Sequence, residues 1–399
     1  MSSRQSDRVV LSNATAAKLI PKLQVVAGKG NLLAAIDHGG THPRFGVFDA
    51  DGKPVLKLKG RREPLSEGLL LELPTYERMP DDLGSSRDLP SYTADRLAEW
   101  LSPILSQTQF LGYAMAGPVT EDGIQVNTPN IWGPEVRNVP WRAMLEERLR
   151  MPGRIALGND MWAAAHDILA RGARRGYDVT NFIVITVSSG IGSKVVRNAK
   201  VDLGVDGLAG EIGHLPVLWP EDIIPGRRCG CGGLYCLEAG SSGNSNAYRA
   251  KTEADRLWPQ GAAGPSARLL ETLWGINLEP GDDLGTRVSA INHAVVRAAR
   301  RADPLAQYLI RRTVRPLARA VAALEAQLNL RNFYFVGGFA LGLGDLFLET
   351  LRREIVALGG ISGRPTQQAL ELGKLYKVTV HDWGLRGAAL GARLALGQR

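Results

Sequence analysis

Cysteine, long apolar runs and blocks of like charge are all scarce in this chain of 399 residues. Its three cysteines, Cys229, Cys231 and Cys236, lie close together in one short stretch. An odd and clustered set argues against a secreted disulfide framework and favours a metal site in a reducing compartment. No run of about 18 apolar residues is present to cross a membrane, and the first residues lack the apolar segment of a signal peptide. We therefore expect a cytoplasmic protein with no membrane partner.

Positive charge exceeds negative charge, with a formal net charge of +8, but the Lys and Arg residues are spread along the chain. A nucleic-acid reader would usually gather them into one patch or one helix. A weakly positive field would equally favour an anionic nucleotide, so the charge alone does not choose between partners. Apolar residues make up 44% of the chain, which is typical of a globular protein with a packed core. The length predicts two domains or one large α/β unit.

Short apolar runs that end in glycine or polar turns alternate with segments of helical periodicity. Residues 384–396, rich in Ala and Gly, predict a closely packed helix. Residues 12–20 predict a short helix that Ser12 or Asn13 caps and Pro21 ends. Residues 194–201 are expected to return as the hairpin partner of a strand at 182–187. The other predicted strands are 32–37, 44–49, 110–116, 154–157 and 332–336, and the other predicted helices are 92–107, 161–171, 266–274, 285–301 and 304–328.

Two glycine turns follow predicted strands. The first glycine turn is Asp37-His38-Gly39-Gly40-Thr41, in which glycines let backbone N–H groups approach phosphate oxygens and the carboxylate can hold hydrated Mg²⁺. The second glycine turn, Ser188-Ser189-Gly190, continues into Ile191-Gly192 and offers hydroxyls to the same phosphates. Each is weak evidence alone, because an ordinary turn after a strand has the same composition.

Gly158-Asn159-Asp160 follows a predicted strand and precedes an alanine-rich helix, at the edge where open α/β sheets bind ligands. The Asp160 carboxylate can accept the proton of a sugar hydroxyl as that hydroxyl attacks a γ-phosphoryl group. The Asn159 amide can fix a neighbouring hydroxyl. The alternative is that either side chain only caps the following helix. The two glycine turns, one before and one after this motif, favour the catalytic interpretation.

The three cysteines, with His214 upstream, form the set of ligands of a closed Cys3His zinc site. Such a site has no open position, so it would be structural rather than catalytic. Three free buried cysteines are the alternative, which their confinement to a glycine-rich loop disfavours. Glu211 and Glu238 flank the cluster and, together with His214, would meet sugar hydroxyls if this loop faces a pocket. Otherwise these two carboxylates are solvated.

In order and spacing these motifs resemble the ROK family of sugar kinases and sugar-responsive repressors, from about Leu33 to Leu396. The resemblance implies an α/β, actin-like (ribonuclease H-like) fold of two lobes with a cleft between them. The small lobe would cover residues 31–155, with residues 384–399 packing back on it. The large lobe would cover residues 156–383 and include a zinc-binding loop at 204–243, and residues 1–30 would form an N-terminal extension. The most specific pieces are Gly210-Glu211-Ile212-Gly213-His214, Cys229-Gly230-Cys231-Gly232, Cys236-Leu237-Glu238 and Ser242-Gly243.

The resemblance also implies roles for individual residues. Asp160 would be the catalytic base, and Gly337 and Gly338 would form the loop on the adenosine side of ATP. The other nucleotide contacts would be Asp37, Gly39, Gly40, Thr41, Ser188, Ser189 and Gly190. The substrate contacts would be Gly117, Asn130, Asn159, Glu211, His214 and Glu238, and the zinc ligands His214, Cys229, Cys231 and Cys236.

These assignments predict an enzyme that uses ATP and Mg²⁺ to phosphorylate a hexose or N-acetylhexosamine hydroxyl, at the 6-position, and that forms a homodimer. The alternative is a sugar-binding regulator or degenerate kinase without turnover. It is motivated by Ser188-Ser189, where the family usually has Gly-Thr, and by His42-Pro43 after the first glycine turn. DNA binding is disfavoured, since the N-terminal extension is too short for a helix-turn-helix domain. A zinc module for protein or nucleic-acid contact is a weaker possibility, because no second cysteine pair accompanies the cluster.

Overall fold

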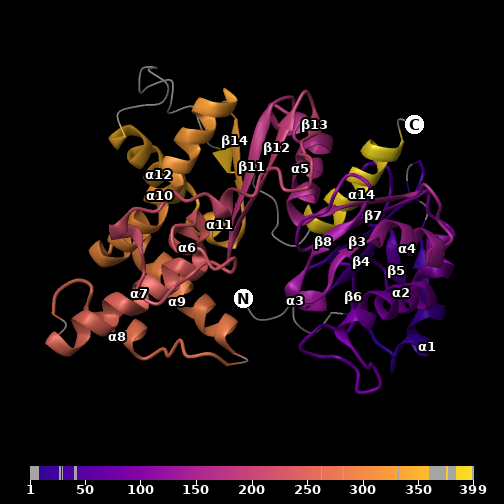
Figure 1. Ribbon diagram of the computed structural model, residues 1–399, viewed down its shortest axis with the longest axis horizontal. Helices are drawn as coiled ribbons and strands as arrows, with labels where there is room; N and C mark the ends of the chain where they lie inside the picture. The colour runs from indigo at the N-terminus through magenta and orange to yellow at the C-terminus, as the bar shows by residue number, and fades with distance from the viewer. Residues whose placement is uncertain are drawn as a thin grey trace. The chain divides into compact units, whose positions relative to one another are not determined.

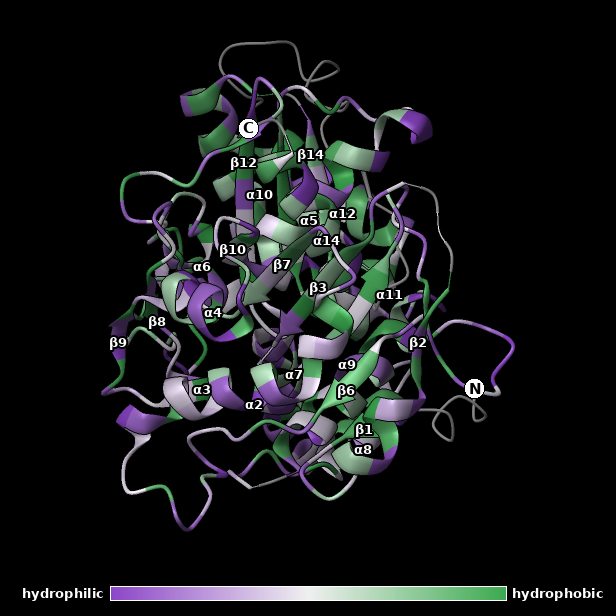
Figure 2. Cartoon of the chain, turned by 90° about the vertical axis from the view of Figure 1, so that its right-hand side faces the viewer, coloured by the Kyte–Doolittle hydropathy of each residue, from purple (hydrophilic) through white to green (hydrophobic). Residues whose placement is uncertain are grey.

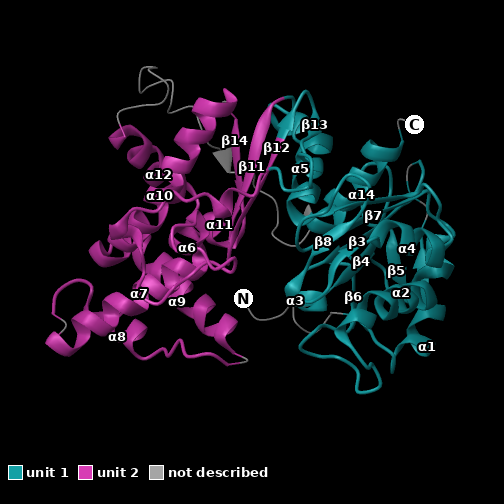
Figure 3. Cartoon of the chain, in the orientation of Figure 1, with its two compact units in different colours: residues 1–180, 196–209, 381–399 teal, residues 181–195, 210–380 magenta. Residues whose placement is uncertain are grey.

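The computed structural model describes residues 9–26, 28, 30–39, 43–261, 263–281, 283–330, 332–358, 374–375 and 383–397. The chain forms two compact units (Figure 3). Unit 1 contains Met1–Thr180, Val196–Ala209 and His381–Arg399, and unit 2 contains Asn181–Val195 and Gly210–Val380. This division differs from the expected lobes, because residues 156–180 and 196–209 fall in unit 1.

Unit 1 is built on a sheet of strand order β1-β6-β4-β3-β7-β10 (Figure 1). Strands β3, β7 and β10 are mutually parallel, and β6 is antiparallel to β4, which is itself antiparallel to β3. The carboxyl ends of β3, β7 and β10 therefore share one edge of the sheet. The bounds are β1 Val10–Leu11, β3 Leu33–His38, β4 Arg44–Phe48, β6 Leu69–Leu71, β7 Phe110–Met115 and β10 Ile155–Asn159.

Both faces of this sheet are buried, as a largely parallel sheet requires. Alternate residues of β3 point to opposite faces: Ala34 and Ile36 join the core under α2 (Leu89–Leu105) and α4 (Trp141–Leu149). Leu33 and Ala35 join a second cluster under α5 (Asp160–Arg171) and α14 (Trp383–Leu396). The predicted C-terminal helix is confirmed.

Helix α14 lies directly on the strands because small residues line the contact. A Cβ added at Gly112 of β7 would lie 1.8 Å from the carbonyl oxygen of Ala388, and one added at Gly387 would lie 2.0 Å from that of Ala163. Neither glycine can carry a side chain without separating the elements. The Ala and Gly content of this helix therefore has a packing cause.

A second large sheet has the order β13-β12-β11-β14-β15, with β11, β14 and β15 parallel. The predicted strand at 194–201 is confirmed as the neighbour of β11 in the sheet, but its bounds differ. Strand β12 begins at Ile191, and Asn198 and Ala199, with φ of 50° and 58°, turn the chain before β13. The bounds are β11 Phe182–Val187, β12 Ile191–Arg197, β13 Lys200–Val201, β14 Phe333–Val336 and β15 Lys374–Leu375.

Helices supply the rest of the core of unit 2. The predicted helix at 304–328 is confirmed as α10, Pro304–Leu328, in which Pro304 takes the first turn and Asp303 Oδ1 caps the Ala306 N–H at 3.0 Å. Figure 2 shows hydrophobic residues on the central elements and polar residues along many of the loops. The other helices of this unit are α6 Leu237–Ser241, α7 Gly243–Leu257, α8 Ala267–Trp274, α9 Leu284–Ala299, α11 Gly338–Leu343 and α12 Asp345–Ala357.

The two sheets repeat one arrangement: β4-β3-β7-β10 in unit 1 matches β12-β11-β14-β15 in unit 2. In each, the first of these four strands along the chain, β3 or β11, leads into one of the glycine turns. The expected helix at 12–20 is shorter, since α1 is Ala16–Leu19 and Pro21 lies in a 3₁₀ turn, Ile20–Lys22, that follows it directly.

Among the described residues no helix is long and apolar enough to cross a membrane. Smaller elements are β2 Leu23–Val25, β5 Leu56–Leu58, β8 Gln125–Asn127, α3 Pro129–Trp132 and β9 Arg137–Val139.

Candidate functional site

Asn159 and Asp160 lie where β10 ends and α5 begins. Asn159 is buried, and its Oδ1 accepts a hydrogen bond from the Trp162 N–H at 2.8 Å, so this side chain caps α5. Asp160 is exposed on the first turn of the helix, where its Oδ1 accepts from the Met161 N–H at 2.8 Å. The capping alternative therefore holds for Asn159, while the Asp160 carboxylate stands at the solvent-facing end of a parallel strand, beside the positive end of a helix dipole.

Asp37, the last residue but one of β3, lies at the same edge of the sheet. Its Oδ2 pairs with Arg44 Nη2 at 2.5 Å, because the β3–β4 register places the two residues opposite each other. A Cβ at Gly384 would lie 2.4 Å from Asp37 Oδ2, so the start of α14 must be a glycine here. Gly39 is described, whereas the predicted nucleotide contacts Gly40 and Thr41 lie outside the described residues.

A buried pair of side chains, His38 and Tyr113, lies at the start of the first glycine turn. His38 Nδ1 lies 2.6 Å from the Tyr113 hydroxyl, and both rings are fully buried. Burial lowers the pKa of His38 to about 3, which keeps the imidazole neutral, and raises the pKa of Tyr113. This pair was not predicted from the sequence, although a histidine at the end of an apolar strand was a visible signal.

Gly117 and Asn130 lie further along the same unit. Gly117 has φ of 92°, and a Cβ there would lie 2.2 Å from the Asn127 carbonyl oxygen, so the turn after β7 requires glycine. Asn130 is exposed on α3 and lines a cavity of about 620 Å³. The other walls of that cavity include residues 70–75 and the Tyr92, Arg96 and Trp100 side chains.

In unit 2 the structure brings two predicted nucleotide loops together. The register of β11 and β14 pairs Thr186 with Val336, so the second glycine turn and Gly337 leave adjacent parallel strands at one edge. A Cβ at Gly337, which has φ of 94°, would lie 2.6 Å from the Val187 carbonyl oxygen. Backbone N–H groups gathered at such an edge are suited to anions.

The second glycine turn is held from its other side by a segment that follows the cysteines. The Gly243 N–H donates to the Ser188 carbonyl at 2.7 Å, and the Asn244 N–H to that of Ser189 at 3.3 Å. The Ile191 N–H donates to Glu238 Oε2 at 3.1 Å. These contacts were not predicted, although Ser242-Gly243 belonged to the motif that carried the resemblance.

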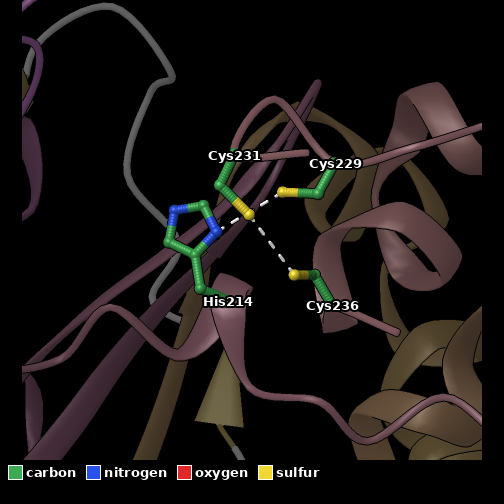
Figure 4. Close-up of side chains that lie close together, drawn as sticks. All are labelled: His214, Cys229, Cys231 and Cys236. Carbon is green, nitrogen blue, oxygen red and sulfur yellow. Dashed lines mark hydrogen bonds between the residues drawn. The ribbon is translucent and has the colours of Figure 1, made fainter. Parts of the chain in front are cut away.

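The four predicted metal ligands converge in unit 2 (Figure 4). Their ligand atoms all lie within 4.8 Å of one another; Cys229 Sγ is 3.4 Å from His214 Nδ1, and Cys231 Sγ is 3.5 Å from Cys236 Sγ. Tetrahedral Zn²⁺ with ligands at about 2.0–2.3 Å needs ligand atoms roughly 3.5–3.8 Å apart. The three thiols and the imidazole therefore fit a tetrahedral cation.

The thiols differ in their surroundings. Burial raises the pKa of Cys229 to about 12, whereas the Gly233 backbone N–H lowers the pKa of the exposed Cys231 to about 7. A cation between the sulfurs favours the thiolate at every position. Of the flanking acids, Glu211 is half-buried at the start of a 3₁₀ turn that ends at His214, and Glu238 is half-buried on α6.

The fold of this chain is similar to that of solved protein structures. The solved ROK family glucokinase from Streptomyces griseus, in complex with glucose and AMPPNP, superimposes with a TM-score of 0.62 over 92% of this chain and all of that chain, at 24% identity. The fold is thus the actin-like fold of two-lobe sugar kinases.

The family follows from sequence. The ROK family model matches residues 88–390. The C(7)-cyclitol 7-kinase of Streptomyces hygroscopicus subsp. jinggangensis is 33% identical over 348 residues, 86% of this chain and 89% of that protein. An N-acetylmannosamine kinase of Escherichia coli is 30% identical over 361 residues, 90% of this chain and 97% of that protein. The chain belongs to the ROK family.

Proposed function

We propose that this protein transfers the γ-phosphoryl group of ATP to a hydroxyl of a small polyol ring, with Asp160 as the general base. The observation that carries the proposal is the exposed Asp160 carboxylate at the carboxyl end of β10. A base there accepts the proton of the attacking hydroxyl. The acceptor is a hexose or N-acetylhexosamine, phosphorylated at the 6-position, or a cyclitol of similar size, since both kinds of kinase occur among the relatives.

The nucleotide contacts follow from unit 2 and from β3. The second glycine turn would bind phosphate oxygens through its N–H groups and hydroxyls, with Gly337 and Gly338 on the adenosine side. Asp37 would hold a water of the Mg²⁺ that bridges the phosphates, and its contact with Arg44 fixes the direction of its carboxylate. Catalysis is then mainly positioning and neutralisation of charge.

Substrate contacts are proposed for the residues named from the sequence. Asn130 and the Gly117 turn would supply polar groups from unit 1, with the Asn159 amide beside the base. Glu211, His214 and Glu238 would supply them from unit 2. The Cys3His cluster would hold a structural Zn²⁺ that fixes the loop carrying these side chains. We also propose a cytoplasmic protein that forms a homodimer, as the family resemblance implies. We propose that it does not bind DNA, because its Lys and Arg residues are spread along the chain rather than gathered in one patch.

A coupled ADP-release assay with Mg-ATP tests the proposal across glucose, mannose, fructose, allose, N-acetylglucosamine, N-acetylmannosamine and a C7 cyclitol. Asp160→Asn should abolish turnover while calorimetry shows that acceptor binding persists, because the amide keeps the shape but cannot accept the proton. Asp95→Asn, at an exposed position of α2, is the matched control. Substantial turnover by Asp160→Asn would remove the base from its role.

The second candidate is a sugar-binding regulator without turnover. Ser189 favours it, because an exposed side chain stands in a turn that phosphate must approach closely. Binding of an acceptor, with no ADP released from ATP in the presence of any member of the panel, would support this candidate. Phosphorus NMR of an active mixture would identify the phosphorylated hydroxyl.

A further inference from the structure

The second glycine turn, residues 188–190, is bound mainly by chain that follows Cys236. Gly243 and Asn244 donate to its carbonyl groups, as described above, and Glu238 supplies the only side chain in this set of contacts. Glu238 Oε2 accepts from the Ile191 N–H at 3.1 Å, at the residue where the turn becomes β12. The carboxylate therefore fixes the exit of the turn.

Little space separates the second glycine turn from the segments on either side of it. A Cβ added at Gly190 would lie 2.7 Å from Glu238 Oε2, and one added at Gly213 would lie 2.4 Å from the Ile191 carbonyl oxygen. The turn is thus enclosed by the carboxylate on one side and by the chain next to His214 on the other. The backbone of Ile191 therefore lies close to both segments.

The same carboxylate reaches the ligand cluster. Glu238 Oε1 lies 3.9 Å from Cys229 Sγ, and Glu238 follows Cys236 by two residues. Helix α6 starts from this cluster: the Leu237 N–H donates to the Leu215 carbonyl at 2.8 Å, and the Ala239 N–H to that of Cys236 at 2.9 Å. The first turn of this short helix is therefore tied to the ligand residue Cys236 and to Leu215, the neighbour of His214.

Regular structure in this region is sparse. Between Gly204 and α6 the chain forms two short 3₁₀ turns, Ile212–His214 and Pro220–Asp222, and an isolated β-bridge between Pro216 and Cys236. A cation bound by four side chains would be a strong cross-link there. We infer that Glu238 is a positioning residue that couples occupancy of the Cys3His cluster to the conformation of the second glycine turn. Its consequence for nucleotide binding rests on the proposed function; the coupling itself does not.

Hydrogen–deuterium exchange tests the coupling on the full chain without requiring turnover. In the Zn²⁺-loaded protein, Glu238→Ala should raise exchange in a peptide covering residues 186–192, with metal content unchanged. Glu238→Gln keeps an oxygen acceptor and should restore most of the protection. Glu221→Ala, an exposed glutamate of the same loop, is the matched control. Removing Zn²⁺ by chelation should raise exchange in the wild type but add little in Glu238→Ala.

Unchanged exchange at 186–192 in Glu238→Ala, or an equal increase on chelation in wild type and Glu238→Ala, would overturn the inference. Circular dichroism on each sample separates loosening of the turn from unfolding. Calorimetry with AMPPNP then measures the functional arm, where we expect about tenfold weaker binding by Glu238→Ala and near wild-type binding by Glu238→Gln. Failure of AMPPNP to bind the wild type would count against the proposed function and leave the exchange result standing.

Discussion

The Arg386 guanidinium donates two hydrogen bonds to the Asp167 carboxylate, from Nε to Oδ1 at 2.6 Å and from Nη2 to Oδ2 at 3.1 Å. Only 9% of the arginine side chain and none of the aspartate side chain is exposed. The pair joins α14 to α5 inside unit 1, and its planar, two-bond geometry is the strongest that these groups form.

Removing one partner of this pair should destabilise unit 1 strongly, because the remaining buried charge loses a partner that binds it through two hydrogen bonds. We expect Arg386→Met to lower the free energy of unfolding by about 3–5 kcal/mol, and Arg386→Met with Asp167→Leu to recover much of that loss. Urea unfolding of the two single variants and the double variant measures this cycle. Single-variant losses below about 1 kcal/mol would show that the pair is not structurally important.

Acid should destabilise unit 1 through two buried histidines. Burial lowers the pKa of His38 to about 3 and that of His166 to about 4, against about 6.5 when unfolded. The unfolded chain therefore binds more protons than the folded chain between these values, so the free energy of unfolding falls as pH drops from about 6.5 towards 3. Each pKa unit corresponds to about 1.4 kcal/mol.

The variant His166→Phe should weaken this pH dependence relative to the wild type. His293→Gln, at an exposed position of α9, is the control. Urea midpoints measured at several pH values between 4 and 7 provide the comparison. Identical slopes for His166→Phe and the wild type would contradict the assignment.

A methyl group at Gly112 should separate α14 from β7. The added carbon would lie 1.8 Å from a backbone oxygen, which no rotamer change can relieve, so we expect Gly112→Ala to cost about 1–3 kcal/mol or more. Gly285→Ala in α9 meets nothing within 4 Å and should be neutral or stabilising by up to about 1 kcal/mol. The midpoint temperature of thermal unfolding should therefore fall in Gly112→Ala and stay the same or rise in Gly285→Ala.

Local patterns in the sequence were sufficient for most elements of the fold. The apolar run at 110–116 became β7, and helical periodicity with Asp303-Pro304 gave both ends of α10. The turn inside the predicted strand 194–201 was missed, because Asn198 and Ala199 adopt left-handed conformations that alternation of apolar residues does not encode. Helix α2 starts earlier than predicted, at Leu89, since Pro90 is tolerated in a first helical turn.

The candidate site was predictable where its members are near in sequence. Cysteine spacing with His214 identified a cluster that the structure assembles. The Glu238 contact with Ile191 joins residues 47 positions apart, and only the fold brings them together. The Asp37–Arg44 pair likewise depends on the strand register across the first glycine turn. Tertiary pairing of this kind leaves no periodic trace in one sequence.

Helix α14 has a consequence for how the protein is made in the cell. The ribosome synthesises β3, β7 and β10 early, yet it must also complete residues 210–380 before the helix that covers their second face emerges. During that interval the apolar side chains Leu33, Phe48 and Phe110 have no cover from Leu385 or Leu390. Unit 1 thus cannot complete its packing during translation of its own first segment, and the nascent chain keeps apolar surface exposed until the late helix docks.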